Sequence, residues 1–187
     1  MFERYTQRAR RAIFYARAEA LARESSEIEV CDIVLGLTRD SHQADFPLPT
    51  LQNDVEKLRE VLLGNSKGVA IPKDPGTELD REIPLSNNSK MAVAYAVEEA
   101  NRDNRYAIDV DHLLRGVLRT SDPVKPKLIL SGYTLPRIRQ FSKEFYKSAP
   151  DLRAPIYWKP RNYLQKHPVL LALIGFVAAY MCWYWHH

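Results

Sequence analysis

Apolar side chains recur at steps of three and four residues in two segments of the chain. The first stripe is made of small and branched residues, Ala9, Ala12, Ile13, Ala16 and Ala20. The second has the same character, with Ala92, Val93, Ala96 and Ala100. This spacing indicates one face of an α-helix in each segment, and the small alanines favour close approach of another helix. Thr6 and Ser86 precede the two predicted helices at equivalent places, and each is a natural N-cap.

The two segments are copies of one unit. When the sequence is shifted by 80 positions, residues 9–39 align with residues 89–119 without a gap, and nine positions are identical. About two identities are expected by chance over such a length. In each copy a polar turn and a short apolar helix follow, near residues 31–38 and 111–118. We predict further helices at 54–62, 125–130 and 135–147.

These elements predict an all-α fold in which two four-helix units are related by a pseudo-two-fold axis. The first repeat covers residues 1–64 and the second covers residues 83–148. Between them, residues 65–82 hold glycines, prolines and charges, which is typical of a surface loop. The expected domain therefore spans residues 1–148.

The region after residue 148 has a different pattern. Residues 149–167 form a Pro-containing basic tether, and residues 168–185 carry no charge. As a helix, the uncharged run would be ~27 Å long, close to the ~30 Å of a bilayer core. Pro168 suits a first helical turn, and Trp183 and Trp185 suit a membrane interface. We predict one C-terminal transmembrane helix. The alternative is an apolar helix buried in the domain or in a dimer.

Lysines and arginines precede the uncharged run, and only histidines follow it. The positive-inside tendency therefore predicts a single-pass membrane protein with its N-terminal domain in the cytoplasm. Cys31 and Cys182 would lie in different phases, so we expect no disulfide bond between them.

Composition and charge narrow the function classes. The chain has 187 residues, 45% of them hydrophobic and 27% charged, which is typical of a globular domain and argues against disorder. The net charge of +4 is mild, and interleaved acids and bases, as at residues 56–60, usually mark a solvated helix face. The basic residues near the apolar run fit anionic lipid better than nucleic acid.

The sequence offers no clear catalytic or cofactor motif. The glycines at 64–68 lack the spacing of a phosphate-binding loop, and no cysteine and histidine cluster has zinc-ligand spacing. Cys31 and His112 are a conceivable nucleophile and base, but a small buried side chain is the commoner role for such a cysteine. We predict a non-enzymatic protein with no cofactor, metal or nucleotide.

The two copies resemble a known family. Residues 2–11, 18–20 and 33–37 resemble the opening of the N-terminal domain of Clp unfoldases, especially of the ClpC type, and residues 89–90, 98–100 and 111–116 are similar to its second repeat. The resemblance covers about residues 1–147. It implies an eight-helix domain that binds substrate proteins or adaptors and passes them to an ATP-driven ring. The predicted tether and anchor stand where the ATPase modules of an unfoldase would begin.

In ClpC-like members, the resemblance further implies two pockets for phosphorylated arginine. A glutamate carboxylate binds the guanidinium, while a threonine hydroxyl and nearby amides hold the phosphate. By position, the threonine sites are Thr6 and Ser86, and the glutamate sites are Cys31 and Asp111. His112 matches the family histidine. Cys31 has no carboxylate and Asp111 is one methylene shorter, so both sites depart from the pattern. The alternatives are helix caps for the two hydroxyls and a structural role for the histidine.

The leading hypothesis is a membrane-tethered protein-binding module that recruits client proteins, or a Clp-type protease complex, to the cytoplasmic face of the membrane. Its binding surface would lie in the cleft between the repeats and on the two short helices. The alternative is an accessory or structural subunit of a membrane complex that kept the fold and lost client recognition. The expected partners are proteins and, through the C-terminal helix, the lipid bilayer, with no nucleic acid and no nucleotide.

Overall fold

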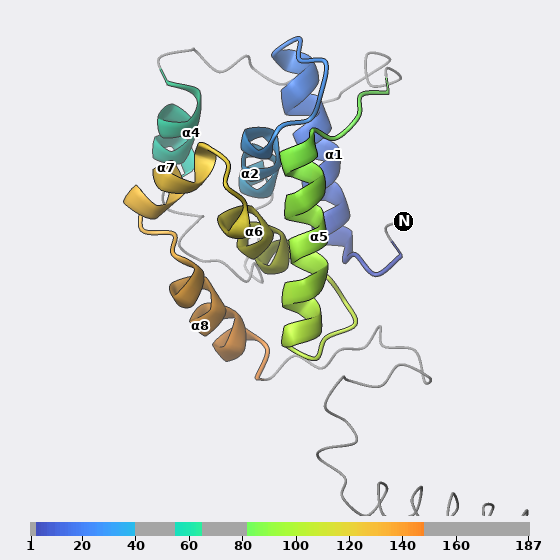
Figure 1. The fold of residues 1–187 in the computed structure, drawn as a ribbon, viewed down its shortest axis with the longest axis vertical. Helices are drawn as coiled ribbons and strands as arrows, with labels where there is room; N and C mark the ends of the chain where they lie inside the picture. Colours follow the sequence, from blue (N-terminus) through green and yellow to red (C-terminus); the bar gives the residue numbers. More distant parts are fainter. Residues whose placement is uncertain (1–2, 40–54, 65–81, 148–187) are drawn as a thin grey trace, which may run out of the picture.

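The computed structural model describes residues 3–39, 55–64 and 82–147, and all regular elements in these ranges are helices (Figure 1). They are α1 (Gln7–Ala22), α2 (Val30–Arg39), α4 (Val55–Leu63), α5 (Asn87–Arg102), α6 (Val110–Arg119), α7 (Val124–Leu130) and α8 (Leu135–Phe145). The predicted helices are confirmed to within about two residues.

Several predicted features lie outside the described residues. They are most of the loop at 65–82, the tether at 149–167 and the transmembrane helix at 168–185. The first unit contributes three described helices, and residues 40–54 also lie outside the described ranges. Within the described ranges, no helix is long and apolar enough to cross a membrane.

The backbone repeats with the same shift of 80 positions as the sequence. The bounds of α5 and α6 are those of α1 and α2 plus 80. The turn after each first helix contains one non-glycine residue with a left-handed backbone, Glu24 in the first unit and Asn104 in the second, both with φ of 56°. The two units are therefore pseudo-symmetric in backbone as well as in sequence.

The segment that precedes the first helix of each unit is hydrogen bonded to the other unit. The N–H of Thr6 donates to the carbonyl of Ile108 at 2.9 Å, and the N–H of Ser86 donates to the carbonyl of Ile28 at 3.0 Å. Each contact forms an isolated parallel bridge between the lead of one unit and the turn of the other. Because both contacts cross between the repeats, the two units form one domain.

A glycine allows each pair of first and second helices to touch. A Cβ atom on Gly36 would lie 2.2 Å from the carbonyl oxygen of Ala12, and one on Gly116 would lie 2.1 Å from that of Ala92. Backbone atoms cannot move aside as a side chain can, so only glycine fits at these contacts. This contact explains the alanine stripes in the sequence.

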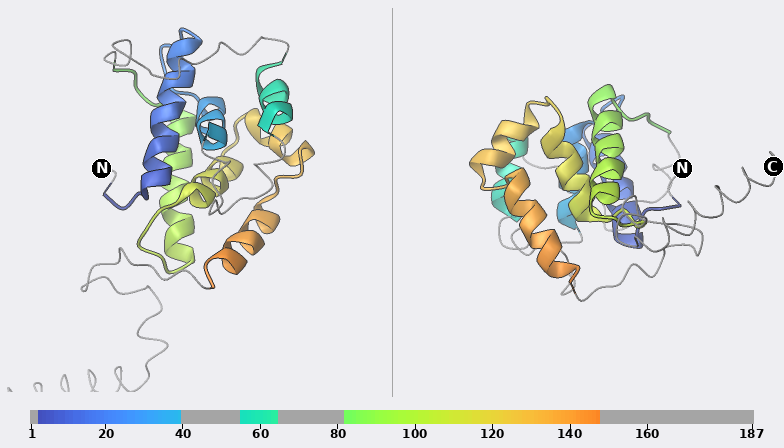
Figure 2. Two further views of the ribbon diagram at one scale, coloured as in Figure 1. Left: turned by 180° about the vertical axis from the view of Figure 1, so that it is seen from behind. Right: turned by 60° about the horizontal axis from the view of Figure 1, so that its bottom comes forward.

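The short helices α2 and α6 form the centre of the domain. Nearly all residues of α2 and all but the last of α6 are buried. The two helices contact each other, while α1 and α5 cover them on one side and α4, α7 and α8 on the other (Figure 2). Most side chains of the two short helices therefore build the core, and the prediction that these helices carry a binding surface stays a prediction.

A buried glutamate fixes three helices in each unit. Glu19 of α1 accepts bonds from Arg39 of α2 and Arg59 of α4, at 3.1 and 2.8 Å. Glu99 of α5 accepts the equivalent bonds from Arg119 of α6 and Arg139 of α8, at 3.3 and 2.7 Å. All six residues keep the shift of 80, so the structural repeat extends to α4 and α8. The charge-rich segment at 56–60 is thus not only a solvated face.

Candidate functional site

The two N-cap hydroxyls lie where the units meet. Thr6 accepts the N–H of Ala9 at 3.1 Å and donates its proton to Asp109 Oδ1, in the other unit, at 2.7 Å. Ser86 accepts the N–H of Ser89 at 3.2 Å. The capping role predicted for both is confirmed. Thr6 faces the start of α6, so it lies beside the predicted site residues of the second unit.

Asp111 is fully buried, and its carboxylate is already bonded within the domain. Oδ2 accepts from Arg115 Nη2 and Oδ1 accepts from the Tyr146 hydroxyl, both at 2.7 Å. Burial alone would raise the carboxyl pKa, but the Arg115 charge and the Tyr146 hydrogen bond help to hold the pKa of Asp111 well below its usual range. Binding of a ligand guanidinium by Asp111 stays a prediction, and it requires Arg115 and Tyr146 to move away.

His112 completes the cap of α6. Its Nδ1 accepts the N–H of Asp109 at 3.0 Å, while the Asp109 side chain caps the helix. Because Nδ1 is an acceptor, the ring proton belongs on Nε2, which lies 3.6 Å from Asp103 Oδ2. The ring also stacks on Tyr146, with 5.9 Å between centroids. This is the structural role that the sequence left open for the histidine.

Among the described residues, Asp103, Asp111 and His112 form the one group whose ligand atoms lie close enough for a cation, within 4.8 Å of one another. Arg115 already supplies the positive charge, since its Nη2 lies 2.7 Å from an oxygen of each carboxylate. A metal ion would have to displace a buried guanidinium, which is costly. The group is therefore best described as an internal ion-pair network, which we call the Asp111 network.

The equivalent place in the first unit is largely uncharged. Cys31 and Leu35 occupy the positions that Asp111 and Arg115 hold in the second unit. Burial is the main cause that raises the pKa of the Cys31 thiol to about 12. A thiol with such a pKa stays protonated at neutral pH, so Cys31 is a poor nucleophile.

The two positions beside this place hold different residues in the two units. In the first unit, Arg23 donates to both carboxylate oxygens of Asp32, at 2.7 and 2.8 Å. At the same two positions the second unit has Asp103 and His112. The second unit thus places an acid where the first has a base, and Arg115 lies 2.7 Å from that acid.

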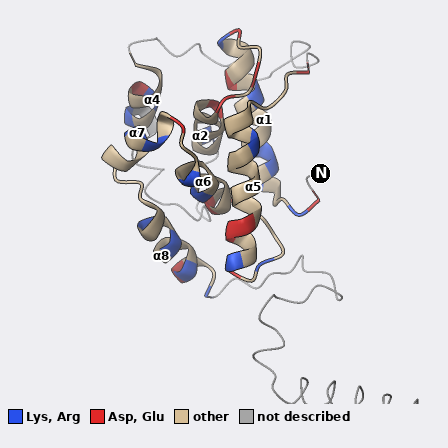
Figure 3. Ribbon diagram, in the orientation of Figure 1, with Lys and Arg blue, Asp and Glu red and all other residues tan. Residues whose placement is uncertain are grey.

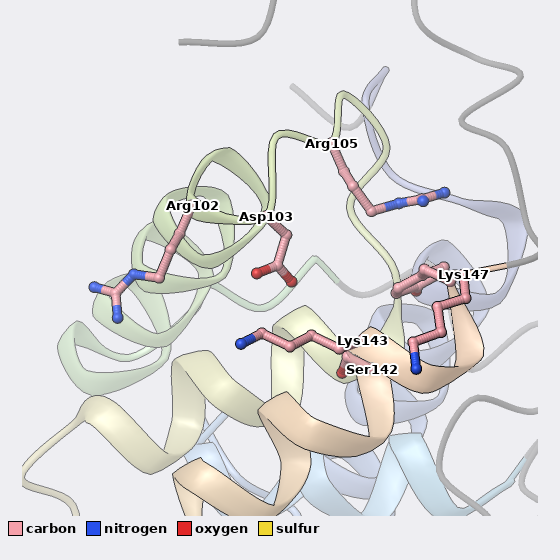
Figure 4. A pocket seen from close by; sticks show the side chains of 7 residues that line it. Arg102, Asp103, Arg105, Ser142, Lys143 and Lys147 are labelled. Atoms are coloured by element: carbon pink, nitrogen blue, oxygen red, sulfur yellow. The ribbon is translucent and has the colours of Figure 1, made fainter. Parts of the chain in front are cut away.

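A basic pocket opens beside the Asp111 network, between the end of α5, the turn after it and the end of α8 (Figure 4). Its volume is about 370 Å³, and it is lined by Arg102, Asp103, Arg105, Ser142, Lys143, Tyr146 and Lys147. The guanidinium of Arg105 stacks over the ring of Tyr146, 3.9 Å from its centroid. We call this cavity the α5–α8 pocket.

Sequence reasoning missed Arg115 and Tyr146. A position-by-position comparison of the two copies gives one signal, because Asp111 and Arg115 lie four residues apart and replace an uncharged pair. Nothing in the sequence joins Tyr146 or Lys143 to the end of α5, since these segments meet only in the folded chain.

Comparison with known proteins places these observations in a family. Residues 4–150 match the Clp repeat (R) N-terminal domain. The negative regulator of genetic competence ClpC/MecB of Bacillus subtilis is 27% identical over 145 residues, and the chaperone protein ClpB of Oceanobacillus iheyensis is 26% identical over 142 residues. Each match covers 75% of this chain and 17% of the relative.

Solved structures share the fold. The N-terminal domain of the chaperone ClpD from Arabidopsis thaliana has a TM-score of 0.60 at 21% identity, covering 79% of this chain and 97% of that one. A chain from preliminary structural investigations of a malarial protein secretion system has a TM-score of 0.59 at 18% identity, with 78% and 97% covered.

The helices and their pseudo-two-fold repeat thus define an all-α double-repeat domain. The chain belongs to the Clp repeat N-terminal domain family, a family of protein-binding modules.

Proposed function

We propose that this protein is a membrane-tethered protein-binding module that recruits client proteins, or a Clp-type protease complex, to the cytoplasmic face of the membrane. The observation that carries the protein-binding part is the family match over residues 4–150. The membrane part rests on the sequence of the uncharged run at 168–185, which lies outside the described residues. Tethering raises the local concentration of a binder, so that modest affinity suffices for recruitment.

A second candidate is an accessory subunit of a membrane complex that has lost client recognition. Two observations favour it. Cys31 offers no carboxylate in the first unit, and the Asp111 carboxylate of the second unit is bonded to Arg115 of the same chain. An accessory subunit would keep the fold for one fixed partner and would need neither carboxylate.

A crosslinked pull-down from detergent-solubilised membranes separates the two candidates. We expect the full chain to capture Clp subunits together with many client proteins. One stoichiometric membrane partner, without Clp subunits, would support the accessory role instead. Failure to capture any protein would contradict both.

The membrane part has its own test. A chain ending at Lys166 keeps the described domain and lacks the uncharged run. We expect the full chain to pellet with membranes after an alkaline carbonate wash, and the shortened chain to stay in the supernatant. If the shortened chain pellets equally well, the run at 168–185 is not the anchor.

A further inference from the structure

We propose that the α5–α8 pocket binds an acidic segment of a protein partner, with its lysines and arginines pairing with aspartate or glutamate side chains. This inference deepens the proposed function, because it takes the ligand to be a protein. It concerns a site separate from the carboxylate positions at Cys31 and Asp111.

The first support is the charge of the lining. Four of the seven lining side chains are cationic, Arg102, Arg105, Lys143 and Lys147. The one acid, Asp103, forms an ion pair with Arg115 at 2.7 Å, and the four cations outnumber it in the lining. Burial opposes ionisation of Asp103, but the Arg115 guanidinium at 2.7 Å helps to hold its pKa below the usual value.

One nearby acid outside the lining is already paired. Glu99 lies 3.8 Å from Arg102, but its oxygens accept two shorter bonds from Arg139, at 2.7 and 3.0 Å. Glu144 accepts a bond from the uncharged Gln140 and keeps its negative charge. Because the lining has four cations and one acid, it presents more positive than negative charge to a partner. Figure 3 shows lysine and arginine positions along α8 and at the end of α5.

The second support comes from the pseudo-symmetry. At the positions equivalent to Arg102, Arg105 and Lys143, the first unit has Ala22, Ser25 and Leu63, so the fold does not require these charges. A cation in the last turn of a helix complements the helix dipole, which accounts for Arg102 and Lys143.

The dipole does not account for the remaining two cations. Arg105 lies in the turn after α5, and Lys147 lies beyond the end of α8. All four cations nevertheless border one cavity, with contributions from two helices that are distant in sequence. A shared ligand explains why four cations border one cavity.

The shape favours a protein segment over a membrane surface. A cavity of about 370 Å³ is at the small end of ligand sites and accommodates individual side chains. Single exposed ion pairs contribute little, whereas several neighbouring cations steer and orient an acidic partner.

The test uses the purified full chain in detergent and a fluorescein-labelled peptide of alternating glutamate and serine. Fluorescence anisotropy is measured at low and at physiological salt, with a glutamine and serine peptide as the uncharged probe. We expect only the glutamate peptide to bind, and to bind less tightly at higher salt.

Two variants locate the binding. Arg102→Ala/Arg105→Ser copies the first unit, so it is compatible with the fold, and we expect about tenfold weaker binding. Lys143→Gln, on the exposed side of α8, should weaken binding about threefold without touching the core. The control, Arg10→Ala/Lys90→Ala, removes two exposed charges from α1 and α5, and should bind as the parent does. Circular dichroism checks that each variant is folded.

Three results would overturn the proposal. The control weakens binding as much as the pocket variants do, or the glutamine peptide binds equally well, or soluble glycerophosphoserine displaces the peptide while a second acidic peptide does not. The last result would assign the pocket to lipid headgroups.

If the pocket variants lose the peptide but still capture the parent's partners in the pull-down, the pocket acts apart from recruitment. If the parent captures no protein at all, the proposed function fails whatever the peptide does.

Discussion

The two units of this domain have the same backbone arrangement, but they have different side chains at one buried place. Between the first and second helices, the first unit has Cys31 and Leu35, whereas the second has Asp111 and Arg115. Both solutions support the same helix bounds and the same glycine contact. The buried ion pair is therefore not a requirement of the fold.

The difference has a structural consequence at one end of the molecule. Asp111 holds the hydroxyl of Tyr146, and that tyrosine lines the α5–α8 pocket. Among the described residues of the first unit, the Cys31 thiol donates instead to Glu29 Oε2 at 3.6 Å. A buried pair of charges is weak evidence for stability, because apolar residues of similar size often do as well. We infer that the second unit keeps its charges to position the end of α8.

The largest effect is expected when the ion pair is broken from one side. Arg115→Leu, which introduces the residue of the first unit, should lower the free energy of unfolding by about 4 kcal/mol, because Asp111 is left buried without its partner. Urea denaturation followed by circular dichroism measures the change.

The matched double variant sharpens this result. Asp111→Cys/Arg115→Leu copies the first unit at both positions and removes the buried carboxylate together with its partner. It should recover part of the lost stability, while Asp103 stays without its ion pair to Arg115. If the double variant is as unstable as Arg115→Leu alone, the two units are not interchangeable at this place.

The next largest effect should be equal in both units. Gly36→Ala and Gly116→Ala each place a Cβ against a carbonyl oxygen of the facing helix, and each should cost about 3 kcal/mol in thermal or urea unfolding. Adding Ala12→Gly to Gly36→Ala should not restore stability, because the clash is with backbone. A loss in only one unit would mean that the two helix pairs do not pack alike.

A smaller effect should appear on acidification. The pKa of Asp111 is lower in the folded chain than in the unfolded chain, so its contribution is complete above the ordinary aspartate pKa, near 4. That contribution is lost as the pH falls through the folded value. Between pH 6 and pH 3, Asp111→Cys/Arg115→Leu should lose about 1 kcal/mol less stability than the parent, in urea titrations at each pH. Parallel curves would contradict this assignment.

The smallest effect concerns the turns. Glu24 and Asn104 both have φ of 56°, a conformation that asparagine tolerates better than glutamate. Glu24→Asn should therefore raise the free energy of unfolding by about 0.5 kcal/mol, and Asn104→Glu should lower it by a similar amount. Thermal unfolding of the two variants tests both signs.

Local features of the fold were well predicted from the sequence. The caps Thr6 and Ser86, the alanine stripes and most helix bounds depend on residues a few positions apart, so periodicity and capping rules apply to them directly. The candidate site was less predictable. Thr6 meets Asp109 across 103 positions, and Tyr146 meets Asp111 across 35, and no local pattern encodes either contact.

The sequence by itself determined the repeat, the helical class and the family, because each is written in spacing and in short motifs. Only the tertiary structure decided that α2 and α6 are central rather than exposed, and that Arg115 pairs with both Asp103 and Asp111. It also decided that cations from α5 and α8 share one pocket. The physical reason is that burial and charge pairing depend on which surfaces face each other, and the packing of the whole domain sets this.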